Sequence, residues 1–181
     1  MKKIILTIVV MICLISQIDA KIRFGIKGGI NSDSPKVENA SASFAQSTGW
    51  HAGAMVQIML PTGLGVQPEL LYTAKNMDIA GKKNGIGYFE IPVNLRYEIN
   101  LVLVRPYFTF GPHFSRPLNV SKLLEPMVNK DEWDWGLGIG GGIEIWKLHT
   151  GLRYSWGMKD MGVSNFEMKN RTFMVSLGLL F

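Results

Sequence analysis

The sequence predicts an all-β fold, an eight-stranded antiparallel up-and-down transmembrane β-barrel. The first observation is that large apolar residues alternate with polar ones, as in "YFEIPVNLRYE" at 88–98, which is the period of a strand with two unlike faces. The second is that the connections between such segments alternate between long and short. The third is that no stretch after residue 20 approaches the roughly 18 apolar residues of a membrane helix, so a chain that spans a bilayer must close into a barrel.

The first 20 residues are predicted to be a signal peptide, which leaves 21–181 as the barrel domain. Two lysines precede an apolar run, and a short polar stretch ends at Ala20, as is typical of secretory signals. The run is too short for a stable membrane helix. Cys13 is the only cysteine, and the isoleucine before it disfavours a lipoprotein signal. The exported chain is therefore expected to lack thiol and disulfide chemistry.

Eight segments carry the strand pattern, and no helical period competes with them after the signal peptide. The predicted strands span 22–31, 49–60, 63–75, 86–98, 101–114, 133–146, 148–157 and 171–181. The first, third, fifth and seventh connections are long, and the fifth is expected to run over 115–132. Transmembrane barrels have this arrangement, with short periplasmic turns at one end and longer external loops at the other.

The apolar face of each strand is predicted to meet lipid and the polar face a narrow lumen. The alternative is a soluble barrel with the apolar face inside. Aromatic residues near strand ends favour the membrane, where they form interfacial girdles. Glycines beside long charged residues suit a narrow lumen, and arginine in place of lysine within strands suits an enclosed ion network. Every second residue from Phe89 to Tyr97 is thus expected to face lipid. Glu90, Asn94, Arg96 and Glu98, which alternate with them, are expected to face the lumen.

Four prolines conflict with this assignment, because a closed barrel has no edge strand to accommodate them. They are Pro68, Pro92, Pro106 and Pro112. We therefore expect β-bulges at these positions, or strand portions that lie beyond the bilayer.

Nine charged residues of the polar face form a predicted lumenal ion network: Arg23, Lys27, Glu69, Glu90, Arg96, Glu98, Arg105, Glu144 and Arg153. One interpretation is an ion-paired plug, and the other is a binding site or conducting path. Eight strands leave an interior just wide enough for side chains, which favours the plug.

The sequence supports an enzymatic role less well than it supports an ion-paired plug. Glu69 and Glu90 lie on neighbouring strands and resemble an acid–base pair. Arg96 and Arg105 are equally near in the strand order, so salt bridges to these arginines are the better expectation. The sequence thus offers no convincing catalytic residue, and the protein is expected not to be an enzyme.

The three histidines give no further site. "HFS" at 113–115 resembles the His-x-Ser of outer-membrane lipid A deacylases, but His113 is predicted to face the lumen and not the lipid. His51 and His149 are isolated in the sequence, with no partner at metal-ligand spacing. No metal and no cofactor are therefore predicted. The formal net charge of +5 is mild and forms no basic cluster, so no nucleic-acid partner is expected.

Six segments resemble the bacterial outer-membrane β-barrel domain family, often described as porin-family or PorT-like proteins. They are "FGIKGGIN", "GVQPELLYTAK", "YFEIPVNLRY", "RPYFTFGPHFS", "WGLGIGGGIEIWKLHTGLRYSWGM" and "NRTFMVSLGLLF", in this order along 21–181. The resemblance implies an eight-stranded barrel in the outer membrane of a Gram-negative bacterium. It implies little about activity.

The functional expectation is a structural or interaction protein. Its long external loops would serve envelope integrity, adhesion or docking to an extracellular or envelope protein partner. Its other partners are expected to be outer-membrane lipid and the barrel-assembly machinery, since a C-terminal strand ending on Phe181 resembles the assembly signal of outer-membrane barrels. The alternatives are a narrow channel or ligand carrier, a component linked to protein secretion as PorT is, and, less favoured, a lipid-acting enzyme.

Overall fold

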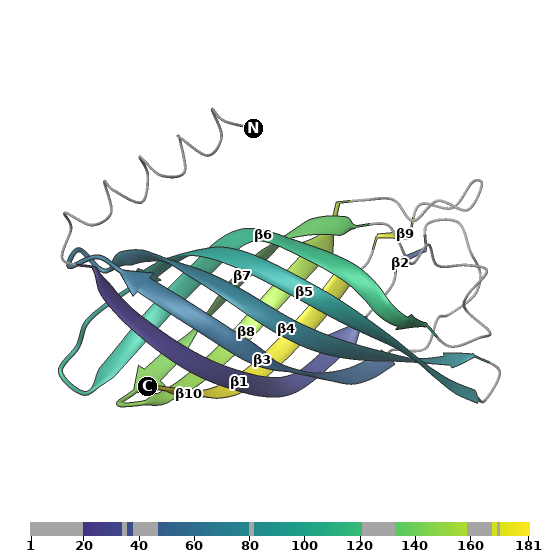
Figure 1. Cartoon of the computed structure of the whole chain (residues 1–181), viewed down its shortest axis with the longest axis horizontal. Coiled ribbons are helices and arrows are strands. Elements are labelled where there is room, and N and C mark those ends of the chain that lie inside the picture. The colour runs from purple at the N-terminus through teal and green to yellow at the C-terminus, as the bar shows by residue number, and fades with distance from the viewer. Residues whose placement is uncertain are drawn as a thin grey trace.

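Eight antiparallel strands close into a barrel, as the sequence predicts. The structure is a computed structural model that describes residues 20–33, 36–37, 47–79, 82–120, 133–158, 168–169 and 171–181. Around the barrel the strands follow the order β1-β10-β8-β7-β6-β5-β4-β3, which is an up-and-down meander closed between the first and last strands (Figure 1). The described part of the chain contains no helix long and apolar enough to cross a bilayer.

The barrel strands are β1 (Lys21–Asp33), β3 (Ser47–Met59), β4 (Leu64–Ile79), β5 (Lys82–Glu98), β6 (Val104–Val120), β7 (Asp134–Ile145), β8 (Leu148–Gly157) and β10 (Arg171–Leu180). Two short strands, β2 (Lys36–Val37) and β9 (Met168–Lys169), pair with each other outside the barrel. They tie the segment that follows β1 to the segment that precedes β10.

The strands extend further at the long-loop end than the sequence analysis predicted. β4 and β5 remain paired as far as Ile79 and Lys82, and β6 continues to Val120, through the first part of the predicted 115–132 loop. Apolar alternation fades in these extensions, so period alone did not reveal them. At the other end the turns are short, at 60–63, 99–103 and 146–147, and the start of β1 and the C-terminus lie there too (Figure 1).

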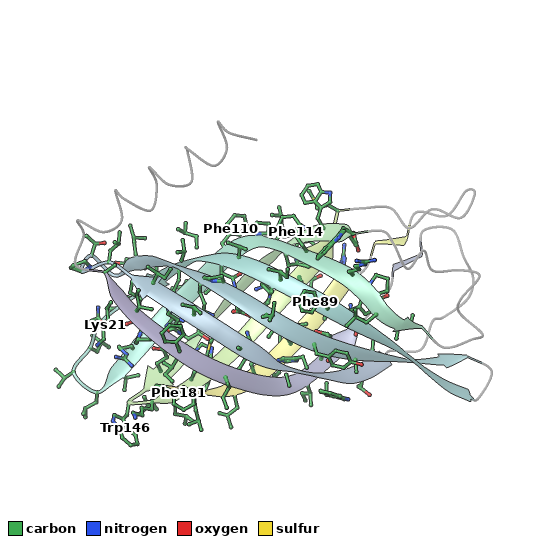
Figure 2. The ribbon with its side chains drawn as sticks, viewed as in Figure 1. Lys21, Phe89, Phe110, Phe114, Trp146 and Phe181 are labelled. Atoms are coloured by element: carbon green, nitrogen blue, oxygen red, sulfur yellow. The ribbon has the colours of Figure 1, made fainter. Side chains whose placement is uncertain are left out.

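The two faces of the wall have the predicted phase. On β5, Val93 and Leu95 are 39% and 57% exposed, whereas Asn94 and Arg96 are 1% and 0% exposed. Large apolar side chains cover the outside along the other barrel strands as well (Figure 2). Tryptophan and tyrosine lie toward the strand ends on this face, for example Trp50 and Tyr97, as in the interfacial girdles of membrane barrels.

The prolines are accommodated differently from the prediction of bulges. Strand pairing is interrupted next to Pro68, Pro92 and Pro112, yet the register is the same on both sides of each interruption. A proline lacks the N–H that a ladder hydrogen bond needs, and the intact pairs on either side hold the register across the gap. The one register shift recorded between β5 and β6 lies elsewhere, at Gly87/Tyr88.

Candidate functional site in the barrel lumen

The lumen contains a compact ion cluster near the short-turn end, which we call the inner cluster: Arg23, Arg96, Arg105, Glu98 and Glu144. Arg23 bridges the two carboxylates, with Nη2 at 2.5 Å from Glu98 Oε2 and Nη1 at 3.0 Å from Glu144 Oε2. Arg96 Nη2 bridges the same two residues at 2.9 and 2.8 Å. Arg105 lies at the edge, 3.7 Å from Glu98 and 3.5 Å from Glu144, with its side chain 23% exposed. Three guanidinium groups therefore share two carboxylates.

Gln57 and His149 complete the coordination of Glu144. Gln57 Nε2 donates to Glu144 Oε1 at 2.7 Å, and His149 Nδ1 lies 3.0 Å from the same oxygen. His149 Nε2 is in turn 3.0 Å from the Tyr107 hydroxyl, and the Arg96 guanidinium stacks over the Tyr107 ring at 3.7 Å. Glu144 and Arg96 are both fully buried. His149, predicted to be isolated, is thus part of the network because β7 and β8 pair Glu144 with His149 directly.

A second group of polar side chains continues the network along the lumen. Lys27 Nζ lies 2.6 Å from Glu69 Oε2, and Gln67 and Asn94 donate to Glu69 Oε1 at 2.6 and 3.1 Å. Arg153 Nη1 donates to Asn94 Oδ1 at 2.8 Å. Because Gln67 also accepts from Arg96 Nη1 at 2.8 Å, this group is joined to the inner cluster.

A third group, the outer cluster, lies toward the long-loop end and was not found from the sequence. Lys75 Nζ lies 3.0 Å from Asp33 Oδ1 and donates to Thr172 Oγ1 at 3.1 Å, and Asn31 donates to Asp33 at 3.0 Å. Asp33 lies two residues past the end of the predicted strand 22–31, and Lys75 is the last residue of the predicted strand 63–75. Asp33 is an even number of residues from Arg23 and Lys27, so on a longer strand its side chain would face the lumen with theirs. That spacing was the sequence signal for this cluster.

Glu90 does not pair with Arg96 or Arg105, contrary to expectation. Glu90 lines a small cavity of about 20 Å³ together with Lys75, His113 and Thr172. None of these three residues belongs to the inner cluster. Glu90 and Arg96 are on the same face of β5 but six residues apart, which is about 20 Å along a strand. Depth in the barrel, and not adjacency in strand order, decides which charges meet. The cavity has room for about one water molecule.

Glycines on the inner face of β7 make space for long side chains. A Cβ at Gly138 would stand 2.6 Å from Arg153 Nη2, and one at Gly136 would stand 2.5 Å from His113 Cε1. His113 therefore points inward, as predicted. The glycine-rich strand is one half of a complementary surface whose other half is Arg153, His113 and Tyr107.

The geometry brings Arg23, Lys27, Glu69, Arg96, Glu98, Arg105, Glu144 and Arg153 together in one connected network, with Glu90 beside it in the cavity. His51, which was also predicted to be isolated, has its Nε2 at 2.8 Å from Ser176 Oγ. Within the described residues, no group of three or more His, Cys, Asp or Glu side chains is arranged to hold a metal ion. The arrangement binds the strands to one another through the lumen.

Comparison with protein families identifies the barrel. Residues 5–181 match the model of the outer membrane protein beta-barrel domain. This chain belongs to that family. As an outer-membrane barrel it places its apolar wall in lipid, which answers the question that strand period left open. No curated protein matches this chain in sequence.

Solved structures of similar fold support the architecture. Ail, the attachment invasion locus protein of Yersinia pestis, solved with the heparin analogue sucrose octasulfate, is 14% identical with a TM-score of 0.55, covering 89% of this chain and 99% of Ail. OprG from Pseudomonas aeruginosa is 14% identical with a TM-score of 0.54, covering 91% and 98%. Neisserial surface protein A is 15% identical with a TM-score of 0.54, covering 87% and 97%. At this identity the likeness concerns the fold.

Proposed function

We propose that this outer-membrane barrel is a structural or interaction protein, closed to transport, that acts through the segments at its long-loop end. The observation that carries the proposal is the filled lumen. Arg96 and Glu144 have no exposed surface, and Arg23 on β1 reaches across the lumen to Glu98 on β5 and Glu144 on β7, at 2.5 and 3.0 Å. The same occupancy supports a non-enzymatic role, since Glu69, Glu98 and Glu144, together with His51 and His149, contact neighbouring side chains.

The orientation follows the general rule for outer-membrane barrels. We assign the short turns to the periplasm and the long connections to the cell exterior. Export by the predicted signal peptide is part of this proposal, and residues 1–19 lie outside those that the structure describes. Binding to an extracellular partner is supported by analogy with Ail, whose structure was solved with a heparin analogue.

The test is complementation of a deletion strain with two barrels. One is the full protein, and the other has residues 38–46, 122–131 and 160–167 replaced by short turns. If the external segments carry the function, both variants reach the outer membrane, but only the full protein restores adhesion to host-type surfaces. If the shortened barrel restores resistance to detergents, the role is envelope integrity. A deletion strain with neither defect contradicts the proposal.

A secretion-linked role of the PorT-like kind is the second candidate. It is favoured by the motif resemblance over 21–181 and by an exposed apolar turn at the periplasmic end, Leu101 to Leu103. The profile of secreted proteins from the deletion strain tests it, and an unchanged profile contradicts it.

Phe181 is proposed as the signal read by the barrel-assembly machinery. Its side chain is 70% exposed, and its N–H donates to Phe24 O at 2.8 Å, where β10 meets β1 and closes the barrel. Phe181→Ser is expected to lower the amount of assembled barrel in cells while the purified variant still refolds in detergent. Equal assembly in cells contradicts this role.

A further inference from the structure

The turn between β5 and β6 presents apolar side chains at the short-turn end. Val102 and Leu103 are 101% and 79% exposed, and Leu101 is 56% exposed. On the wall, Leu95 and Leu177 are 57% and 58% exposed. Val102 and Leu103 are therefore more exposed than the apolar side chains on the wall that faces lipid.

The neighbouring turn adds an aromatic residue to this surface. Val104 pairs with Ile145, and Arg105 Nη2 donates to Trp146 O at 2.9 Å, so the two turns lie side by side. Trp146 is 80% exposed and has φ of 54°, a left-handed conformation that is rare for a bulky residue. Figure 2 shows Trp146 at the same end of the barrel as Lys21 and Phe181. We call Leu101, Val102, Leu103 and Trp146 the turn patch.

Two cationic side chains border the turn patch. Lys147 Nζ lies 5.6 Å from the Trp146 ring, and Arg105 borders the same turn with a partly exposed side chain. The nearest carboxylates in the sequence, Glu98 and Glu144, are buried in the inner cluster. The patch thus has an apolar centre and a cationic edge.

The backbone of the turn is unsuited to the interior of a bilayer. Leu101 N–H donates to Ile99 O and Val104 O, at 3.1 and 3.2 Å. Within the part of the chain that the structure describes, the N–H groups of Val102 and Leu103 make no backbone hydrogen bond. Irregular backbone does not occur in contact with hydrocarbon, because each unpaired group costs several kcal/mol there. Water or another protein satisfies these groups, whereas an acyl chain does not.

We propose that the turn patch is a docking site for a protein of the periplasm that has an apolar cleft bordered by carboxylates. Exposed apolar patches with a polar border mark interaction surfaces. The apolar centre would enter the cleft, and complementary charge at the edge would set orientation. The inference rests on the proposed orientation of the barrel and is independent of what the external segments bind.

The first experiment separates protein docking from lipid anchoring. The only cysteine, Cys13, lies in the predicted signal peptide, so single cysteines can be labelled with the fluorophore NBD at Val102, at Leu95 on the wall and at Thr62 in the β3–β4 turn. The labelled barrels are placed in phosphatidylcholine vesicles that contain doxyl-labelled acyl chains. We expect strong quenching at position 95 and equally weak quenching at 102 and 62. Quenching at 102 that equals quenching at 95 makes the patch a lipid anchor and overturns the proposal.

The second experiment tests for the partner. A photo-crosslinking amino acid at position 102 is activated in living cells, with position 62 as the matched control. The protein captured only at 102 is purified, and its affinity for the full barrel is compared with its affinity for Leu101→Ser/Leu103→Ser. We expect affinity to fall about tenfold or more, which corresponds to about 1.4 kcal/mol, because the variant loses two apolar side chains from the centre of the contact. Heat-modifiable migration on gels verifies that the variant is folded.

Four results overturn the proposal in this second experiment. The first is that position 102 captures no protein that position 62 does not also capture. The others are crosslinks to lipid alone, crosslinks to a second copy of this chain, and a captured protein that binds the double variant as tightly as it binds the original.

Discussion

Glu144 shows how a buried charge is held in this lumen. It is fully buried and lies within 4.0 Å of nitrogen atoms of Arg23, Arg96, Arg105 and His149. Burying ions is costly, and the mutual attraction of ions offsets this cost only where the remaining polar atoms also find partners. Gln57 and His149 supply such partners, so the inner cluster depends on hydrogen-bonding neighbours as well as on the arginines.

We expect Glu144→Gln to destabilise the barrel by about 3–5 kcal/mol, because three arginines would then face only Glu98. Urea unfolding in lipid vesicles, followed by tryptophan fluorescence, measures the change. Lys147→Gln, an exposed change three residues away, is the control and is expected to alter stability by less than about 0.5 kcal/mol. A Glu144→Gln barrel as stable as the control would show that the inner cluster does not hold the strands together.

Val93 tests the lipid-facing phase at a single position. It lies midway between Phe89 and Tyr97 on the outer face of β5. Val93→Arg is expected to cost about 2–4 kcal/mol, as arginine does near the midplane of a barrel's lipid face. The same unfolding measurement applies, with Val93→Leu as a control of similar polarity that is tolerated. If both variants are equally stable, the β5 face does not contact hydrocarbon.

At the scale of elements, β7 packs against long side chains of its neighbours because several of its own residues are glycines. Its inner face offers glycines where Arg153, His113 and Tyr107 lie. A Cβ at Gly142 would meet the Tyr107 hydroxyl at 2.7 Å, as well as the Thr150 backbone. The strand is therefore specific to this set of long side chains.

Gly138→Ala is predicted to displace Arg153, because the three nearest atoms to the added Cβ, at 2.6 to 2.9 Å, all belong to that guanidinium. Overpacking of this kind costs about 1–3 kcal/mol. In an Arg153→Ser background the cost is expected to vanish, which a double-mutant cycle of unfolding free energies detects. Gly28→Ala, where the nearest atom is 3.4 Å away, is the matched control. An equal cost of Gly138→Ala in both backgrounds contradicts this packing.

At the scale of the whole molecule, the network joins strands that are distant in the chain. Arg23 on β1 contacts Glu98 on β5 and Glu144 on β7, so the lumen is crossed by ion pairs near the short-turn end. The barrel is thereby tied together through its centre in addition to its strand ladder. These contacts across the lumen are the basis of the proposed plug.

The full barrel reconstituted in a planar bilayer is expected to show no stable single-channel steps in 1 M salt. Regular, ion-selective steps that change with Arg96→Gln would show that the lumen conducts. Such conductance would make a narrow channel, and not a closed structural barrel, the leading hypothesis for function.

Location gives a further prediction for the intact molecule. The protein is expected to fractionate with outer membranes and to migrate faster on gels before heating than after it, because a closed eight-stranded barrel resists detergent until it is boiled. Recovery as a soluble periplasmic monomer would contradict the assignment of the apolar wall to lipid.

The sequence by itself determined the strand number, the meander and the two faces of the wall. These are local properties, since side chains alternate with a period of two and a lipid-facing wall favours apolar residues at the outward positions. Val93 and Asn94 could be assigned to opposite faces without knowledge of any partner strand. The family resemblance was also visible at this level.

The tertiary structure decided which lumenal groups meet. Register and strand tilt set the depth of each residue, so Glu90 lies in a cavity with Lys75, whereas Glu144 gathers the arginines. The same staggering brings His149 to Glu144 and places the Leu101–Leu103 turn beside Trp146. Depth depends on how all eight strands close on one another, which no single strand's sequence specifies.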